Sequence, residues 1–369
     1  MKKQKVIMRC KLLLAVTLLS AVYSVSADSL ENLLFTVRRD DRECGSAFLA
    51  SEAGRVWMMS NYHVVKGDAA IEFIGMTDRS RVYSLPEKFE VSKDRDAIRF
   101  QLEETNGFTV ASGCEFDDEV LAFGNSGGAG VITKSKGTVV GRGRGQIEVT
   151  CEIIPGNSGG PVINARNEVV GIATFIIKAP ISGLSDEQLA LLPDAERDRI
   201  IEKTKETKGT RYTDTRRFAV PVCDTQWQEV SLTVFKEESV RFEALDEKYD
   251  QFNEAIVSVF KARSMSTKNA ELFSRSWVNN YNDELDEYGY YSSESGRFYI
   301  KSGRKESFYR AYGRWLRALS EAAERTSNEY AEESEILTIS YFKQEISARA
   351  DKLSRTSKEL LTASEKYKP

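Results

Sequence analysis

This chain of 369 residues divides into a glycine-rich part and a glycine-poor part, and the change lies close to Cys223. Only four of its 24 glycines fall within residues 224–369. Before Cys223, short aliphatic and aromatic runs alternate with glycine and other turn residues. Such runs are typical of short strands, so residues 34–222 are predicted to form an all-β barrel or sandwich. The runs are GSAFLAS, RVWMMS, AAIEFIG, AIRFQL, EVLAFG, QIEVTCEII, PVIN, VVGIATFII and RFAVPV.

One stretch before the last predicted strand has a different pattern, at about residues 178–217. It contains SDEQLALL, in which Ser185 precedes Gln188 by three residues, as in the capping box that begins many helices. The following DAERDRIIEKTKE also has a helical pattern. We therefore expect a helical insertion within the β-rich part, at a position where it could cover a cleft as a lid.

Residues 224–369 have the apolar spacing of packed helices. Two seams recur at alternating intervals of three and four residues, the period of helices that pack along one face. The seams are Phe242, Leu245, Tyr249, Phe252, Ile256 and Val259, and then Phe308, Tyr312, Trp315, Leu319 and Ala322. This part is predicted to be an α-helical bundle or coiled coil and not a second β-domain, with YGYYSSESGRFY as a loop between helices.

The segment 1–27 has the three parts of a secretory signal peptide. Basic residues come first, an apolar stretch runs from Leu12 to Val22, and Val25-Ser26-Ala27 has the pattern of a cleavage site. The apolar stretch is too short to span a bilayer, and no later stretch is long and apolar enough. We expect export to the periplasm or out of the cell, no integral membrane span afterwards, and two units at residues 28–223 and 224–369.

The charge balance argues against nucleic acid as the partner. The net charge is −4, and 29% of the residues are charged. A surface that binds nucleic acid is usually strongly basic. Arg142 and Arg144 in VVGRGRGQ form only a weak patch, so this segment is expected to be a mobile surface loop.

The cysteines and the single histidine make a metal site improbable. Four cysteines follow the signal peptide, and none of them is in a Cys-x-x-Cys arrangement that could bind zinc. In an oxidising compartment, one or two disulfides are expected, and sequence alone leaves all three pairings of four cysteines open. The four residues are Cys44, Cys114, Cys151 and Cys223.

Three polar residues have the chemistry of nucleophilic catalysis. His63 is the sole histidine, and Asp96 and then Ser158 follow it along the chain. A serine hydroxyl becomes a good nucleophile when a base removes its proton, and an imidazole can take that proton near pH 7 and later return it. A buried carboxylate fixes the imidazole tautomer and stabilises its protonated form.

The order and setting of these residues resemble the chymotrypsin-fold serine proteases, and the motifs resemble their HtrA (Deg) branch. SNYHVV is similar to that family's Thr-Asn-x-His-Val motif, DAIRFQL to its Asp-Ile-Ala-Leu strand and GNSGGPV to its nucleophile motif. EVLAFGNSGGAG and FAVPV are similar to two further segments. The resemblance covers about residues 43–222. There it implies a double β-barrel, serine endopeptidase activity on protein or peptide substrates, and no cofactor.

The pentapeptide Gly-Asn-Ser-Gly-Gly occurs twice, and the resemblance gives the two copies different roles. The copy around Ser126 matches a structural turn of the family, so its serine is expected to be inert. The copy around Ser158 is followed by Pro161 and a strand, as the nucleophile loop requires. The resemblance further implies that the backbone amides of Gly156 and Ser158 form the oxyanion hole.

Two positions depart from the family's pattern or offer an alternative. Asp94 is a rival to Asp96 as the third catalytic residue, but it would place charged Arg95 where the family has an apolar residue. Arg99 occupies a strand position that is normally apolar, and we expect its side chain to face outward.

Glu152 lies shortly before Ser158, where trypsin-like members of the fold carry an aspartate that recognises lysine or arginine. A carboxylate in this pocket would favour a basic residue before the cleaved bond. The alternative is that the segment alternates as a strand and that Glu152 faces solvent.

The sequence thus predicts an exported serine endopeptidase that works through an acyl-enzyme. The competing interpretation is a catalytically silent protease fold that acts as a binding or scaffold module. In either case residues 224–369, where the family usually carries PDZ domains, are expected to mediate homo-oligomerisation, substrate recruitment or docking to a partner protein.

Overall fold

A computed structural model describes residues 30–143, 145–178, 215–292 and 297–367. The expected signal peptide at residues 1–27 and nearly all of the expected helical insertion lie outside the described residues. At the margins of that insertion, residue 178 and residues 215–217 belong to strands. No helix in the described part of the chain is long and apolar enough to cross a membrane.

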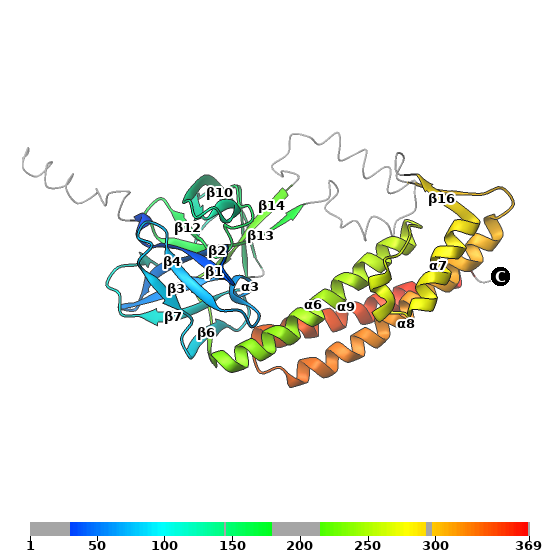
Figure 1. Ribbon diagram of the computed structural model, residues 1–369. Coiled ribbons are helices and arrows are strands. Elements are labelled where there is room, and N and C mark those ends of the chain that lie inside the picture. Colours follow the sequence, from blue (N-terminus) through cyan, green and yellow to red (C-terminus); the bar gives the residue numbers. More distant parts are fainter. Residues whose placement is uncertain (1–29, 144, 179–214, 293–296, 368–369) are drawn as a thin grey trace, which may run out of the picture.

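The β-rich part forms two sheets, as expected for a double-barrel fold (Figure 1). The first is an open, nine-stranded half-barrel in the order β15-β6-β7-β3-β2-β1-β4-β5, with β8 beside β2. It contains β1 (Leu34–Arg39), β2 (Arg42–Glu52), β3 (Arg55–Ser60), β4 (Ile71–Gly75), β5 (Val82–Ser84), β6 (Lys88–Ser92), β7 (Ile98–Leu102), β8 (Phe108–Thr109) and β15 (Trp227–Ser231).

The second sheet is a closed barrel in the order β10-β11-β14-β13-β12-β9. Its interior is filled by small and β-branched side chains, which suit the narrow lumen of a six-stranded barrel. Its strands are β9 (Glu119–Gly124), β10 (Thr133–Gly143), β11 (Gln146–Val149), β12 (Pro161–Asn164), β13 (Val169–Lys178) and β14 (Thr215–Pro221).

The expectation of a mobile loop at VVGRGRGQ is wrong, because most of that segment lies in two paired strands. It forms the end of β10 and the start of β11, and Val139 in it is fully buried. Arg142 forms an ion pair with Glu115. The glycine and arginine content of this segment suggested a loop, but closure of the barrel requires a strand between β9 and β11. Backbone hydrogen bonds, which do not depend on the side chains, supply most of the pairing of that strand.

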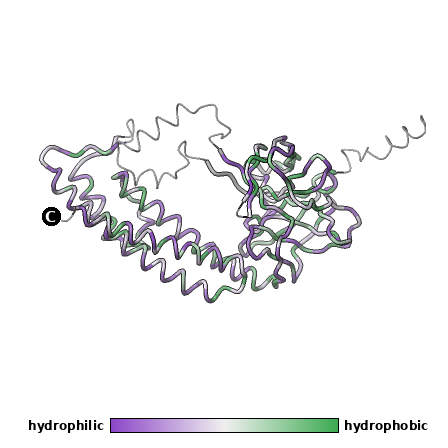
Figure 2. The backbone as a smooth tube through the Cα atoms, turned by 180° about the vertical axis from the view of Figure 1, so that it is seen from behind, coloured by the Kyte–Doolittle hydropathy of each residue, from purple (hydrophilic) through white to green (hydrophobic). Residues whose placement is uncertain are grey.

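Four long helices form most of the C-terminal part, and the two predicted seams lie in their shared interior. Phe252, Val259, Trp315 and Leu319 are each at most 2% exposed. Hydrophobic and hydrophilic residues alternate along the helices, as Figure 2 shows. The helices are α6 (Leu232–Phe260), α7 (Arg275–Tyr288), α8 (Lys305–Ile336) and α9 (Ser340–Glu365).

Two segments of this part are not helical. The expected loop YGYYSSESGRFY contains a hairpin of β16 (Gly289–Ser292) and β17 (Arg297–Ile300), in which Tyr290 and Tyr299 stack across the strands. β15 pairs with β6 and so belongs to the first sheet. The reason is geometric: after leaving the second barrel at β14, the chain returns to the open edge of the half-barrel before it enters α6.

The helical part is packed against the half-barrel. Gln228 of β15 donates to the Thr338 carbonyl and accepts from the Ser340 amide, both at 3.0 Å. Buried Glu238 of α6 accepts from the amides of Thr338 and Ile339 at 2.9 Å. These contacts fix the start of α9 against β15 and α6. A single apolar core runs from the half-barrel into the helices, whose far end carries the β16–β17 hairpin away from the barrels (Figure 1).

Candidate active site

His63 lies on α3 (Tyr62–Val65), a single helical turn that follows the end of β3. Tyr62 and Val65 are buried and anchor this turn in the core, whereas the His63 side chain is 36% exposed. The turn therefore presents the imidazole at the surface on a backbone that packing holds in place.

Asp96 lies just before β7 and contacts His63 twice. Its Oδ2 atom is 2.5 Å from His63 Nδ1, and its Oδ1 atom accepts from the His63 backbone amide at 3.1 Å. The carboxylate is 14% exposed. This arrangement fixes Nδ1 as the protonated nitrogen of the neutral ring and leaves Nε2 free to accept a proton.

Asn61 holds the two sheets together beside this pair. Its Nδ2 atom donates to the Asp96 carbonyl at 2.5 Å and to Thr174 Oγ1 on β13 at 3.0 Å. The sequence reasoning missed both Asn61 and Thr174 as site residues. Asn61 could have been found, because it belongs to the same SNYHVV motif as His63.

Ser158 lies in the loop between β11 and β12, at the junction of the two sheets. Its hydroxyl donates to the Thr174 carbonyl at 2.9 Å, and its own carbonyl accepts from the Ser46 amide of the half-barrel at 2.8 Å. Within the described part of the chain, no hydrogen bond joins the Ser158 hydroxyl to His63. The structure thus brings all three residues to one junction, with the histidine and aspartate paired and the serine hydroxyl turned to β13.

The loop before Ser158 leaves two backbone amides free. The Pro155 carbonyl accepts from the Gly127 amide at 2.8 Å, and a trans peptide directs the following Gly156 amide to the opposite side. Neither the Gly156 amide nor the Ser158 amide donates to another described residue. Gly156 has a φ of 97°, and a Cβ there would lie 2.0 Å from the Asn125 carbonyl oxygen, so the position requires glycine.

The upstream pentapeptide copy packs under this loop. Ser126 begins a short 3-10 turn, and its hydroxyl donates to Asn157 Oδ1 at 2.7 Å and lies 2.5 Å from Thr133 Oγ1. Gly127, with a φ of 72°, supplies the amide that holds the Pro155 carbonyl. This copy has the geometry of a turn, as expected, and its contacts make it the support of the loop that carries the other copy.

Asp94 does not reach His63. It is half-exposed, lies 3.5 Å from the Arg95 guanidinium and accepts from Ser92 Oγ at 3.2 Å. Asp96 is therefore the carboxylate that meets the imidazole.

Arg99 faces away from the barrel core, as expected, but its side chain is buried and not exposed to solvent. It is 9% exposed and lies between the rings of Trp57 and Trp227, 4.0 and 4.4 Å from their centroids. Glu52 and Glu90 neutralise its charge at 2.5 Å. The side chain does leave the barrel core, but β15 brings Trp227 over it, and cation–π contacts make an arginine suitable there.

Glu152 has an exposed side chain and lies beyond the end of β11. Its backbone amide donates to Ser135 Oγ at 2.6 Å. An exposed carboxylate is more consistent with the solvent-facing alternative than with the base of a pocket, and its role in specificity remains a prediction.

The expected disulfides are absent, because all four cysteines are free thiols. Cys44 belongs to the half-barrel and Cys151 to the interior of the second barrel, so separate cores hold these two. Burial raises the pKa of each of the four thiols, and that of Cys151 to about 11. The thiols are therefore protonated and poorly nucleophilic near pH 7.

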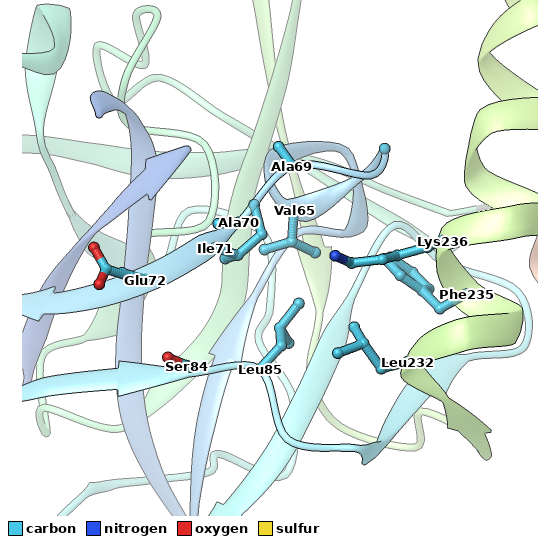
Figure 3. Close-up of a pocket in the computed structure, with 11 residues that line it drawn as sticks. Val65, Ala69, Ala70, Ile71, Glu72, Ser84, Leu85, Leu232, Phe235 and Lys236 are labelled. Atoms are coloured by element: carbon cyan, nitrogen blue, oxygen red, sulfur yellow. The ribbon is translucent and has the colours of Figure 1, made fainter. Parts of the chain in front are cut away.

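A cavity of about 240 Å³ lies between the end of α3 and the first turns of α6 (Figure 3). Its walls are mainly apolar and include Val65 and Phe235. Lys236 extends toward Val65 in Figure 3, and its Nζ atom donates to the Asp68 carbonyl at 3.0 Å. The cavity backs onto the turn that carries His63 and is lined by none of the three candidate catalytic residues.

Comparison with known proteins finds similarity to the β-rich part. Residues 45–172 match the family model of the trypsin-like peptidase domain, a range that includes His63, Asp96 and Ser158. Together with the two sheets, this match supports a chymotrypsin-like fold for residues 45–172, which are similar in sequence to DegP-like (HtrA-type) proteases.

Three curated relatives are similar over the same domain. The probable periplasmic serine endoprotease DegP-like of Chlamydia trachomatis serovar D is 28% identical over 144 residues, which are 36% of this chain and 28% of that protein. The DegP-like protein of Rhizobium meliloti is 33% identical over 150 residues, or 37% and 28% of the two chains. The putative serine protease HhoB of Synechocystis is 28% identical over 160 residues, or 39% and 38%.

The aligned region is thus about 28% of the length of the DegP-like relatives. Among solved structures, the HtrA-type protease AlgW with tripeptide superimposes with a TM-score of 0.35 at 20% identity, over 52% of this chain and 57% of that one.

Proposed function

We propose that this chain is an exported serine endopeptidase that hydrolyses peptide bonds of protein substrates through an acyl-enzyme. Ser158 is the nucleophile, His63 the general base and then acid, and Asp96 the carboxylate that orients the imidazole. The observation that carries the proposal is the double contact of Asp96 with the ring and backbone of His63, at the junction where Ser158 also lies.

The proposed catalytic steps give each of these groups a role. His63 Nε2 takes the hydroxyl proton as Ser158 Oγ attacks the substrate carbonyl, and the free amides of Gly156 and Ser158 stabilise the oxyanion. The protonated imidazole then donates to the departing amine, which leaves an acyl-enzyme. A water molecule, activated by the same imidazole, hydrolyses the ester and returns Ser158 to its starting state.

The attack requires one rotation that the resting site has not made. The Ser158 hydroxyl must leave the Thr174 carbonyl and turn toward His63 Nε2, which requires a change of the Ser158 rotamer. In apo enzymes catalytic hydrogen bonds often form only when substrate binds, so this geometry is compatible with activity.

The same observation supports a second candidate function. A fold whose serine stays bonded to Thr174 would be a catalytically silent module that binds peptides without cleaving them. The presence of the aspartate–histidine pair and of two free amides favours the peptidase, because a binding module needs neither.

Export to the periplasm or beyond belongs to this proposal. Its supports are the signal-peptide pattern in residues 1–27 and the periplasmic DegP-like relatives.

Digestion of a peptide library by the mature protein tests the proposed activity. The expected result is cleavage that disappears in Ser158→Ala, with the sequence preference read from the new ends. Preference for lysine or arginine before the cleaved bond, lost in Glu152→Ala, would support a basic-specific pocket. Absence of cleavage under all conditions, with peptides still bound, would favour the silent module.

A further inference from the structure

The segment from Arg297 to Arg317 carries an unusual excess of positive charge. It contains seven lysine or arginine residues and one acidic residue, Glu306, whereas the whole chain has 52 basic and 56 acidic residues. The basic residues are Arg297, Lys301, Arg304, Lys305, Arg310, Arg314 and Arg317. None of these residues has a role in the proposed catalysis.

Three of these arginines line one groove on the helical part. Arg310, Arg314 and Arg317 are spaced by four and three residues on α8, which places them on the same face of the helix. The groove has a volume of about 400 Å³ and lies between α8 and the end of α9. Seven residues of helix span about 10 Å, which is the length of about three residues of extended peptide.

Gly313 and Tyr367, two of the residues that line the groove, are closely packed. Gly313 lies between the arginines, and a Cβ at this position would come 2.9 Å from the Tyr367 Cβ atom. Tyr367 packs against Tyr309 and Tyr312, with ring centroids 5.7 and 5.2 Å apart. The absence of a side chain at Gly313 therefore allows the end of α9 to lie close to α8.

The positive charge in the groove is only partly compensated by ion pairs. Arg314 pairs with Glu284 at 2.5 Å. Arg310 and Arg317 are exposed and make no ion pair with any described residue. Among the described residues that line the groove, Glu321 is the only one with a carboxylate.

From this arrangement we propose that the α8–α9 groove docks an acidic segment of another polypeptide. Guanidinium groups bind carboxylates in a bidentate geometry, and an extended peptide with closely spaced aspartates or glutamates could engage Arg310 and Arg317 together. The groove favours a peptide over a membrane surface, because its arginines line a hollow between two helices. If the proposed peptidase activity holds, the groove recruits acidic protein substrates at a distance from the catalytic junction; the docking itself does not depend on that activity.

The test is binding of a fluorescein-labelled, glutamate-rich peptide to the full-length chain, measured by fluorescence anisotropy. Ser158→Ala is used as the background, so that cleavage plays no part. The same peptide with glutamines is the ligand control. Binding of the glutamate peptide is expected to weaken with salt and to fall at least about tenfold in Arg310→Glu/Arg317→Glu.

A charge-matched control separates the groove from net charge. Arg355 and Lys358 are exposed on α9 outside the groove, and their double replacement by glutamate should leave binding nearly unchanged. Equal loss in both double variants, or retention of binding in Arg310→Glu/Arg317→Glu, would overturn the proposal. So would equal affinity for the glutamine peptide, or binding to phosphatidylglycerol vesicles without binding to the glutamate peptide. Circular dichroism checks that each variant is folded.

Discussion

The two oxygens of the Asp96 carboxylate make two different contacts with His63. One oxygen orients the imidazole through Nδ1, and the other holds the backbone amide of the same residue. The ring and the turn that carries it are thus fixed by a single side chain. Asn61 links the Asp96 carbonyl to the Thr174 hydroxyl on β13. The Ser158 hydroxyl donates to the carbonyl of the same threonine.

Loss of either member of the reacting pair should abolish turnover. Ser158→Ala and His63→Ala are each expected to lower kcat by roughly 10⁴–10⁶, because neither group can act without the other. The double variant should be little worse than either single variant. Steady-state kinetics on a peptide identified from the library would measure this, and additive losses would contradict a shared role.

The candidate catalytic residues could be proposed from the sequence because local motifs carry them. His63 and Ser158 lie in short strings whose chemistry depends on neighbours along the chain, and Asp96 heads a strand. Arg99 was misjudged because its environment depends on Trp227, which is distant in the sequence and reaches it through the pairing of β15 with β6. No local pattern carries that information.

At the scale of elements, α3 joins the catalytic junction to the helical part. Tyr62 precedes His63, is 2% exposed and contacts four aromatic rings from α6 and α9. Those rings belong to Phe235, Phe242, Tyr341 and Phe342. The position of the imidazole therefore depends on helices that follow the peptidase domain.

Substitutions of Tyr62 should distinguish the contribution of its ring to stability from that of its hydroxyl. Tyr62→Ala removes a buried ring and should cost about 3–5 kcal/mol of unfolding free energy, with a fall in kcat because α3 loosens. Its hydroxyl has no hydrogen-bond partner among the described residues, so Tyr62→Phe should be neutral or stabilising by up to about 1 kcal/mol. Denaturant unfolding measures both values, and a large loss in Tyr62→Phe would show that the hydroxyl has a partner in solution.

α9 also brings a second carboxyl toward Asp96. Burial raises the pKa of Glu345, Arg349 opposes this shift, and repulsion from Asp96 and Asp246 adds to it. A raised pKa means that the folded state binds the proton more tightly than the unfolded state. Its contribution to stability is therefore present at low pH and is lost as pH rises from the unfolded value of about 4.3.

Glu345→Gln should remove this pH dependence. We expect the variant to be more stable than the native chain at pH 7, with a smaller difference at pH 4, as measured by thermal unfolding. A variant that is less stable at pH 7 would mean that ionised Glu345 is favourable in the folded state, through Arg349.

For the whole molecule, the boundary in composition does not coincide with a boundary in packing. The switch from a strand pattern to helical seams near Cys223 could be predicted from the sequence because each pattern is local. Two other features could not be predicted, because they depend on contacts between distant segments. They are the pairing of β15 with β6 and the core shared by the half-barrel and the helices. The pairing of β16 with β17 was missed for a different reason, because the polar and glycine residues of YGYYSSESGRFY resemble a loop.

A chain that ends at Cys223 should therefore fold poorly. It would lose β15, expose the edge of β6 and uncover Tyr62 and Phe89, which contact α6. The full-length chain should show a single calorimetric transition for the half-barrel and helices. A soluble, active protein ending at Cys223 with unchanged melting temperature would show that the helices are an independent unit.

The most direct measurement is the site of labelling by a fluorophosphonate, which modifies serine hydroxyls that an adjacent base activates. Mass spectrometry of the labelled mature protein should find the adduct on Ser158, and labelling should be lost in Ser158→Ala and His63→Ala but kept in Ser126→Ala. An adduct on Ser126, or no adduct while substrate peptides are still bound, would contradict a catalytic Ser158.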